Sequence, residues 1–317
     1  MSDMMELGHR IVDEVEKVIV GKRPVIERVL TGLIAGGHVL LEDVPGVGKT
    51  MMVRALSRAL SLESHRLQCT PDLMPQDVTG MNVYNRRDER FDFRPGPVFT
   101  NILLADELNR ATPRTQSALL EAMQEGQATV DGDTMALPKP FFVLATENPI
   151  EQEGTFPLPE AELDRFLLRI AVGYPDEESE RELVRRGAGQ DLLPQVQPVT
   201  DADGILSLQK AVGTIEVSPP VLDYIVSLSR ALRSRPGIAL GPSPRATLAL
   251  TSACRAQALL EGRGFVVPDD VQSLAEPVLA HRIMLDASAE LGGTTRGEVL
   301  AQTLEELPVP FEGQGRR

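Results

Sequence analysis

The stretch that most constrains the fold of this 317-residue chain is residues 40–50, LLEDVPGVGKT. An apolar strand pattern at residues 38–41 runs into a turn rich in glycine and proline, and a helical pattern begins near Thr50. Glycines without a Cβ let such a turn aim its N–H groups at an anion, and the positive end of the following helix dipole favours the same charge. The arrangement predicts a phosphate-binding loop for a nucleoside triphosphate.

Two residues of this loop have specific expected roles. Lys49 would reach the β- and γ-phosphates, and the Thr50 hydroxyl would hold Mg²⁺, so ATP and Mg²⁺ are the expected cofactors. Asp43 replaces the first glycine of the usual G-x4-GK[ST] pattern, at a position that precedes the N–H groups around the phosphates. The residues of this stretch expected to contact the nucleotide are Val44, Pro45, Gly46, Val47, Gly48, Lys49, Thr50 and Met51.

An acidic pair follows a second apolar strand pattern. Residues 101–106 have the composition of a buried strand, which ends in Asp106 and Glu107. The carboxyl ends of parallel strands border the crevice in which open α/β sheets bind ligands. We expect Asp106 to hold Mg²⁺ through its water shell and Glu107 to polarise the attacking water.

Three further polar residues are candidates with open alternatives. Asn148 ends the strand predicted at residues 141–146; it would either position the attacking water or simply form a turn before a proline. Arg165 would either pair with Asp164 or bring its charge to a phosphate on an adjacent molecule. Arg245 lies in the first turn of a predicted helix, where a cation opposes the helix dipole unless an anion meets it.

The N-terminal residues 6–34 show helical spacing that Gly21 interrupts. The segment is either a helix–turn–helix that covers the core, or an apolar pocket in which Val20 and Gly21 pack against an adenine.

Two hairpins are predicted. One lies between the phosphate-binding loop and the acidic strand, and the other lies between the acidic strand and the strand predicted at residues 141–146. Residues 81–84 and 90–93 flank a polar turn within an insert of about residues 81–97, and a second hairpin covers about residues 127–138. The first insert is longer than a connection requires, which favours a working protrusion over a surface elaboration without a role.

From residue 175 onward, amphipathic helical patterns replace strand patterns. We therefore predict an α/β nucleotide-binding core with a parallel sheet between helical layers over residues 1–174. An all-helical lid over residues 175–317 would carry Arg245.

Composition excludes several classes. The net charge of −14 argues against an extended basic surface for nucleic acid or anionic lipid. Cys69 and Cys254 have no disulfide or metal-ligand spacing, no apolar signal segment begins the chain, and no apolar run is long enough to cross a bilayer. We expect a cytoplasmic protein.

With these motifs in place, the chain resembles the AAA+ ATPases, and within them the MoxR family, over about residues 18–279. The matching segments are LEDVPGVGKT (41–50), LLADELNRATPRTQSALLEAMQE (103–125), FFVLATENPIEQEGTFPLPEAELDRF (141–166) and GPSPRA (241–246). The resemblance implies Walker A residues Lys49 and Thr50, Walker B residues Asp106 and Glu107, sensor 1 Asn148, arginine finger Arg165 and sensor 2 Arg245.

The resemblance also implies an activity and partners. Such a protein would hydrolyse ATP as a chaperone-like remodeller, usually as a hexameric ring. It would work beside a von Willebrand factor A domain protein in maturing client complexes or inserting metal into them. The alternatives are a nucleic-acid-translocating ring ATPase, a chelatase motor subunit and a nucleotide-gated scaffold.

Overall fold

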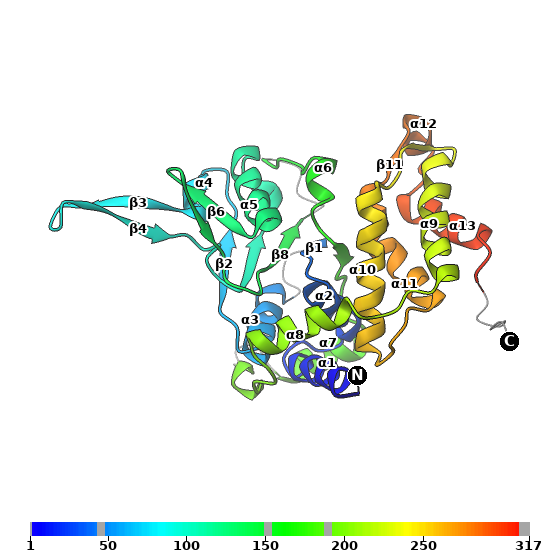
Figure 1. Cartoon of the computed structure of the whole chain (residues 1–317), viewed down its shortest axis with the longest axis horizontal. Helices are drawn as coiled ribbons and strands as arrows, with labels where there is room; N and C mark the ends of the chain where they lie inside the picture. The colour runs from blue at the N-terminus through cyan, green and yellow to red at the C-terminus, as the bar shows by residue number, and fades with distance from the viewer. Residues whose placement is uncertain (1, 43–47, 149–153, 187–191, 311–317) are drawn as a thin grey trace. The chain divides into compact units, whose positions relative to one another are not determined.

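The computed structural model describes residues 2–42, 48–148, 154–186 and 192–310 (Figure 1). The chain forms two compact units. The larger unit is Leu7–Ser207, and the smaller unit combines Met1–Glu6 with Leu208–Arg317. The larger is an α/β unit and the smaller is mainly helical, which confirms the predicted fold class.

The larger unit contains a five-stranded parallel sheet with the strand order β2–β5–β8–β1–β9, of which β2, β8 and β1 are labelled in Figure 1. Its strands are β1 (Val39–Glu42), β2 (Ser64–Gln68), β5 (Ile102–Asp106), β8 (Phe142–Glu147) and β9 (Leu168–Ala171). All of β5 and nearly all of β8 is buried. Because helices cover both faces of such a sheet, its central strands β5 and β8 are apolar up to the polar residues at their carboxyl ends, which is the pattern seen in the sequence.

The two faces of the sheet pack against different helices. On one face, α2 (Arg23–Ile34) approaches so closely that a Cβ added to Gly32 would lie 2.4 Å from Val39 Cγ2. The other face packs against α5 (Pro113–Glu125). The buried side chains on that face include Leu40, Leu103, Val143, Leu119 and Leu120. Alternation along the strands places neighbouring residues on opposite faces, so both layers are filled.

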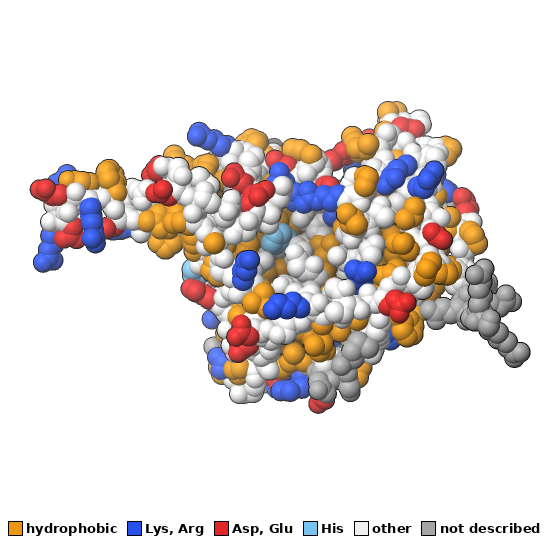
Figure 2. All heavy atoms as spheres, in the orientation of Figure 1, with side chains coloured by type: hydrophobic (Ala, Val, Ile, Leu, Met, Phe, Trp, Pro, Cys, Tyr) orange, Lys and Arg blue, Asp and Glu red, His pale blue; other side chains and the backbone are white. Residues whose placement is uncertain are grey.

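The first hairpin, β3 (Gly80–Asn85) and β4 (Arg90–Pro95), projects from the larger unit after the short helix α4 (Pro75–Thr79) (Figure 1). Tyr84 lies opposite Phe91, and their ring centroids are 5.3 Å apart. Figure 2 shows charged side chains at the tip of this hairpin and hydrophobic ones behind the tip.

The second hairpin consists of β6 (Gln127–Val130) and β7 (Asp133–Ala136). Its turn is tied to the first hairpin, because Asn82 Nδ2 donates to Asp131 Oδ2 over 2.8 Å.

The N-terminal segment forms α1 (Ser2–Glu16) and α2, joined through Gly21. Gly21 has a left-handed backbone with a φ of +68°, and a Cβ there would lie 1.9 Å from Ser179 Oγ. Ser179 belongs to α7 (Glu177–Arg186). Only glycine therefore fits at this junction.

The described residues between 175 and 207 lie in the larger unit. They include α7, the 3₁₀ turn η2 (Leu193–Gln195) and the start of α8 (Ala202–Val212). Arg58 Nε donates to Val196 O and Val199 N donates to Ala59 O, each over 2.7 Å, which attaches the segment to the end of α3 (Lys49–Ala59). The division of the sequence into a core over residues 1–174 and a lid over residues 175–317 stays a prediction.

The smaller unit is built mainly from helices, as predicted for the residues after 175. They are α9 (Pro219–Ser234), α10 (Pro244–Leu260), α11 (Pro268–Leu279) with the 3₁₀ turn η3 (Ala280–Arg282), α12 (Ala287–Leu291) and α13 (Arg296–Glu306). A two-stranded ladder of β10 (Ile238–Leu240) and β11 (Met284–Leu285) was not predicted, because strands this short show no alternation in the sequence. Among the described residues, no helix has the length and apolar character needed to cross a membrane.

Candidate nucleotide-binding site

The phosphate loop ends at the N-terminus of α3. The predicted residues Val44, Pro45, Gly46 and Val47 lie outside the described residues. Gly48 has a φ of +85° and precedes the helix, whose first turn contains Lys49, Thr50 and Met51. The first N–H groups of a helix have no partner within it, so this turn can bind a phosphate.

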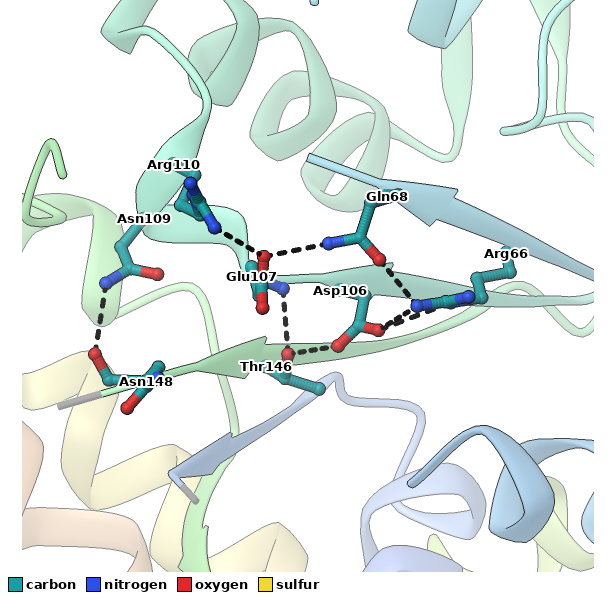
Figure 3. Close-up of polar contacts among 8 residues, drawn as sticks. All are labelled: Arg66, Gln68, Asp106, Glu107, Asn109, Arg110, Thr146 and Asn148. Atoms are coloured by element: carbon teal, nitrogen blue, oxygen red, sulfur yellow. Dashed lines mark hydrogen bonds and ion pairs between the residues drawn. The ribbon is translucent and has the colours of Figure 1, made fainter. Parts of the chain in front are cut away.

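The acidic pair lies at the carboxyl end of β5, where Thr146 of β8 contacts both acids (Figure 3). Thr146 Oγ1 donates to Asp106 Oδ1 over 2.7 Å and accepts the backbone N–H of Glu107 over 2.8 Å. Glu107 is left-handed, with a φ of 57° and a ψ of 49°. This backbone turn, held by Thr146, separates the directions of two carboxylates that are adjacent in sequence.

The neighbouring strand β2 supplies partners that the sequence analysis missed (Figure 3). Arg66 donates to Asp106 Oδ2 from Nη2 over 2.7 Å and from Nε over 3.2 Å. Gln68 Nε2 donates to Glu107 Oε2 over 2.9 Å, and Arg66 Nη2 donates to Gln68 Oε1 over 2.5 Å. The sequence feature that could have revealed these partners is the spacing of Arg66 and Gln68. They occupy alternate positions of one strand, so their side chains lie on the same face.

Glu107 also pairs with Arg110, at the end of the 3₁₀ turn η1 (Leu108–Arg110). Arg110 Nη1 lies 3.3 Å from Glu107 Oε2. The Glu107 carboxylate is therefore oriented by two donors, an amide and a guanidinium. Arg110 is engaged within the site of its own chain.

Asn148 directly follows β8 and is buried. Its backbone oxygen accepts a long hydrogen bond, 3.4 Å, from Asn109 Nδ2. Gln116 Nε2 donates to the carbonyl oxygens of Leu108 and Phe156 over 3.2 and 2.9 Å. These bonds join the segment after the acidic strand to the segment after Asn148, so the two predicted sites lie together at one edge of the sheet.

Negative charge is concentrated at this edge. Burial, together with the charges of Asp106 and Glu107, raises the pKa of Cys69 to about 12. Burial also raises the pKa of Glu147, an effect that Arg169 opposes. A site with this much acidic character attracts a cation.

The expected adenine side lies beside the phosphate loop. A Cβ on Gly48 would lie 3.8 Å from Ile19 Cδ1, which places the residues before Val20 and Gly21 next to the loop. Lys22 is buried, and its Nζ donates to three carbonyl oxygens after β9, over 2.7 to 3.0 Å. The acceptors belong to Val172, Gly173 and Tyr174. Adenine contact by Val20 and Gly21 stays a prediction.

The two arginines with predicted roles lie in different units. Arg165 Nη1 donates to Leu120 O of α5 over 3.1 Å. Arg245 is exposed in the first turn of α10, where Ser243 Oγ accepts the N–H of Ala246 over 3.2 Å. Their roles as arginine finger and sensor 2 stay predictions.

The residues present fit Mg²⁺ bound together with a nucleotide. No cluster of three or more His, Cys, Asp or Glu side chains that could hold a metal occurs among the described residues. In nucleotide sites Mg²⁺ is typically held by one or two protein oxygens, the phosphates and water, so such a cluster is not required. The Asp106 carboxylate and the Thr50 hydroxyl are oxygen donors of the required kind.

Comparisons with known proteins support this architecture. The family described as "ATPase family associated with various cellular activities (AAA)" matches residues 38–168, and an AAA lid domain matches residues 230–303. The crystal structure of a Cytophaga hutchinsonii protein assigned as an ATPase superposes with a TM-score of 0.91 and 39% identity, covering 97% of this chain and 96% of that chain. The fold and site thus define an AAA+ ATPase core with its lid.

Full-length relatives identify the family. Chaperone MoxR1 of Mycobacterium tuberculosis is 42% identical over 95% of this chain and 82% of its own length. Protein MoxR of Methylorubrum extorquens is 32% identical over 98% and 97%. The chain belongs to the MoxR family of AAA+ ATPases. A shorter match, at 29% identity, covers 64% of this chain and 57% of the magnesium-chelatase 38 kDa subunit of Rhodobacter capsulatus.

Proposed function

We propose that this protein hydrolyses ATP with Mg²⁺ and uses the cycle to remodel protein complexes as a chaperone. One observation carries the proposal: Thr146 orients Asp106 and Glu107 at the carboxyl end of a central strand. These acids would face a nucleotide bound at the N-terminus of α3, because the carboxyl ends of parallel strands border the crevice in which open α/β sheets bind ligands. Names of the relatives, including a chaperone, support the remodelling role.

The chemistry follows from positioning and charge. Lys49 would bind the β- and γ-phosphates, while Thr50 and Asp106 would hold Mg²⁺, which neutralises charge on the phosphate oxygens. Glu107 would orient and polarise the attacking water. Gln68 and Arg110, which both contact its Oε2 atom, would hold the carboxylate in place for this role. Asn148 would fix the same water from the neighbouring strand.

Assembly would complete the site. Arg165 would act as a finger on the nucleotide of an adjacent copy in a ring, usually a hexamer, and Arg245 would contact the phosphates from the lid. An arginine finger contributes about 10³–10⁵ in rate, so hydrolysis would depend on assembly. The protein would act in the cytoplasm together with a von Willebrand factor A domain protein. The two would mature a client protein complex or insert metal into it.

The first hairpin would contact the client. Phe91 is 68% exposed and pairs with Tyr84, which gives the hairpin an aromatic surface that folding of the chain does not bury. Exposed aromatic groups of this kind are typical of interaction sites.

The test is the ATPase rate against protein concentration, for the wild type and Glu107→Gln. Wild-type specific activity should rise as a ring-sized species forms, and Glu107→Gln should bind ATP but hydrolyse it about 10²–10⁴-fold more slowly, the usual contribution of a general base. Glu121→Gln, an exposed change on α5, is the matched control and should keep full activity. Turnover by Glu107→Gln at the wild-type rate would disprove the assignment.

Mixing experiments test the finger. Arg165→Ala should bind ATP without assembly-dependent activity. Mixed with Glu107→Gln, which retains its arginine, Arg165→Ala should regain hydrolysis at its own intact Glu107. If the mixture stays inactive although both variants assemble, the finger does not act between subunits.

A chelatase motor is the second candidate, favoured by the match to the magnesium-chelatase subunit. The MoxR relatives match over a larger share of the chain, which favours the remodelling function. Stimulation of the ATPase by a tetrapyrrole would reverse this preference, and salt-dependent stimulation by DNA would favour a nucleic-acid motor.

A further inference from the structure

The carboxylate expected to hold the water shell of Mg²⁺ already has a cationic partner. Arg66 Nη2 lies 2.7 Å from Asp106 Oδ2, and Nε of the same guanidinium lies 3.2 Å from that oxygen. The Asp106 side chain is 12% exposed and the Arg66 side chain is 49% exposed, so water screens this ion pair only in part.

Hydrogen-bond capacity makes Arg66 a competitor of the metal. A carboxylate oxygen has about two acceptor positions. The two Arg66 N–H groups occupy those of Oδ2, and Thr146 occupies one on Oδ1. A water of hydrated Mg²⁺ could reach Oδ2 only by replacing Arg66, and at the remaining position of Oδ1 the charge of the metal would be repelled by the guanidinium.

The same guanidinium is linked to the second acid. Arg66 Nη2 donates to Gln68 Oε1, and Gln68 Nε2 donates to Glu107 Oε2. Figure 3 shows this continuous path from Asp106 through Arg66 and Gln68 to Glu107. Movement of Arg66 would remove the bond that orients the Gln68 amide.

Arg66 can leave where Thr146 cannot. Thr146 is fully buried in a central strand, whereas the Arg66 side chain is 49% exposed on β2, which lies at the edge of the sheet. A long side chain with an exposed head group can exchange its partner for water without disturbing the core.

We infer that Arg66 is the resident counter-cation of Asp106, which the Mg²⁺–nucleotide complex displaces on binding. Arg66 thereby sets the Mg²⁺ concentration that the site requires, and its departure frees Gln68 and Glu107 for the attacking water. Arg66 is a positioning residue in this scheme. The inference rests on the proposed ATP site and adds to it a competition between a side chain and the metal.

The test is equilibrium binding of a fluorescent, non-hydrolysable ATP analogue during titration with Mg²⁺. Arg66→Gln removes the competing charge, so the half-saturating Mg²⁺ concentration should fall about tenfold, as expected for one charge at a partly screened site. Affinity for the analogue in EDTA should stay within about twofold, because a half-exposed guanidinium that competes only with the metal contributes little to binding of the phosphates. Arg66→Lys keeps the charge without the two-pronged geometry and should give an intermediate value.

The matched control is Arg90→Gln, which removes the same charge from an exposed ion pair with Asp92 on the hairpin. It should leave the Mg²⁺ dependence unchanged, so that a general effect of net charge is separated from a local one. Far-UV circular dichroism checks that each variant is folded. If Arg66→Gln does not fold, the Arg66→Lys titration decides the question alone.

Three results would overturn the inference. They are an unchanged Mg²⁺ dependence in Arg66→Gln, a higher Mg²⁺ requirement, or weaker binding in EDTA, which would make Arg66 a phosphate ligand. A crystal structure with Mg²⁺ and nucleotide should show Arg66 and Asp106 more than about 4 Å apart, beyond ion-pair distance; retention of the 2.7 Å contact would also contradict it. If the wild type binds no nucleotide at all, the proposed ATP site fails instead.

Discussion

His38 provides a sharp test of the energetics of the larger unit. Its ring is buried, Nδ1 accepts the N–H of Val143 over 3.0 Å, and Nε2 lies 3.0 Å from Met123 O. This pattern is satisfied by the neutral ring with its proton on Nε2. Burial lowers the pKa of His38 from 6.5 to about 4, because a charged ring would lose its hydration.

The sign and size of the effect follow from this shift. A lowered folded-state pKa means that the unfolded chain takes up the proton first, so the stability due to His38 is present above pH 6.5 and is lost as the pH falls toward 4. The full shift corresponds to about 3 kcal/mol, of which about 2 kcal/mol is lost between pH 7 and pH 5.

The comparison is between the wild type and His38→Asn, in urea unfolding at pH 7 and pH 5. Asn can still accept the Val143 N–H but does not titrate, so the variant should start about 1–3 kcal/mol less stable and lose about 2 kcal/mol less on acidification. Because the chain contains no tryptophan, far-UV circular dichroism is the suitable signal. Equal losses in both proteins would refute the reasoning, since all other titrating groups are shared.

Three further predictions concern buried groups. Lys22→Met should lower the free energy of unfolding by about 3 kcal/mol in urea titrations, because one buried and two partly buried carbonyl oxygens lose their charged donor; a loss below 1 kcal/mol would contradict this. Gly21→Ala should cost more than Gly36→Ala in thermal melts, since both have positive φ and cost about 1–2 kcal/mol for the backbone, but only Gly21 meets Ser179. Cys69, with a pKa of about 12, should resist iodoacetamide at pH 8 in the native protein and react in urea, as mass spectrometry would show.

The sequence predicted the elements whose signals are local. The apolar run that ends in Asp106 and Glu107 became β5, because a strand covered on both faces must be apolar along its length. The sequence also contains local signals for the limits of α5, since Pro113 occupies its first position and Gly126 is its left-handed C-cap.

The remaining contacts depend on which segments become neighbours in space. The sequence places Arg66 and Gln68 on a short strand, but only the strand order puts β2 beside β5 and gives both residues their acidic partners. Lys22 and the carbonyl oxygens that it binds are about 150 residues apart. No local periodicity encodes such pairs, because they arise from the packing of whole elements.

The left-handed backbone of Glu107 has a consequence for evolution. Glycine adopts this conformation without strain, and asparagine with little, whereas glutamate costs about 1–2 kcal/mol. Heat tolerance alone would therefore favour replacing Glu107, although this carboxylate is the group assigned to the attacking water. In a library selected only for survival on heating, position 107 should accumulate glycine and asparagine, and the most thermostable descendants would be poor catalysts.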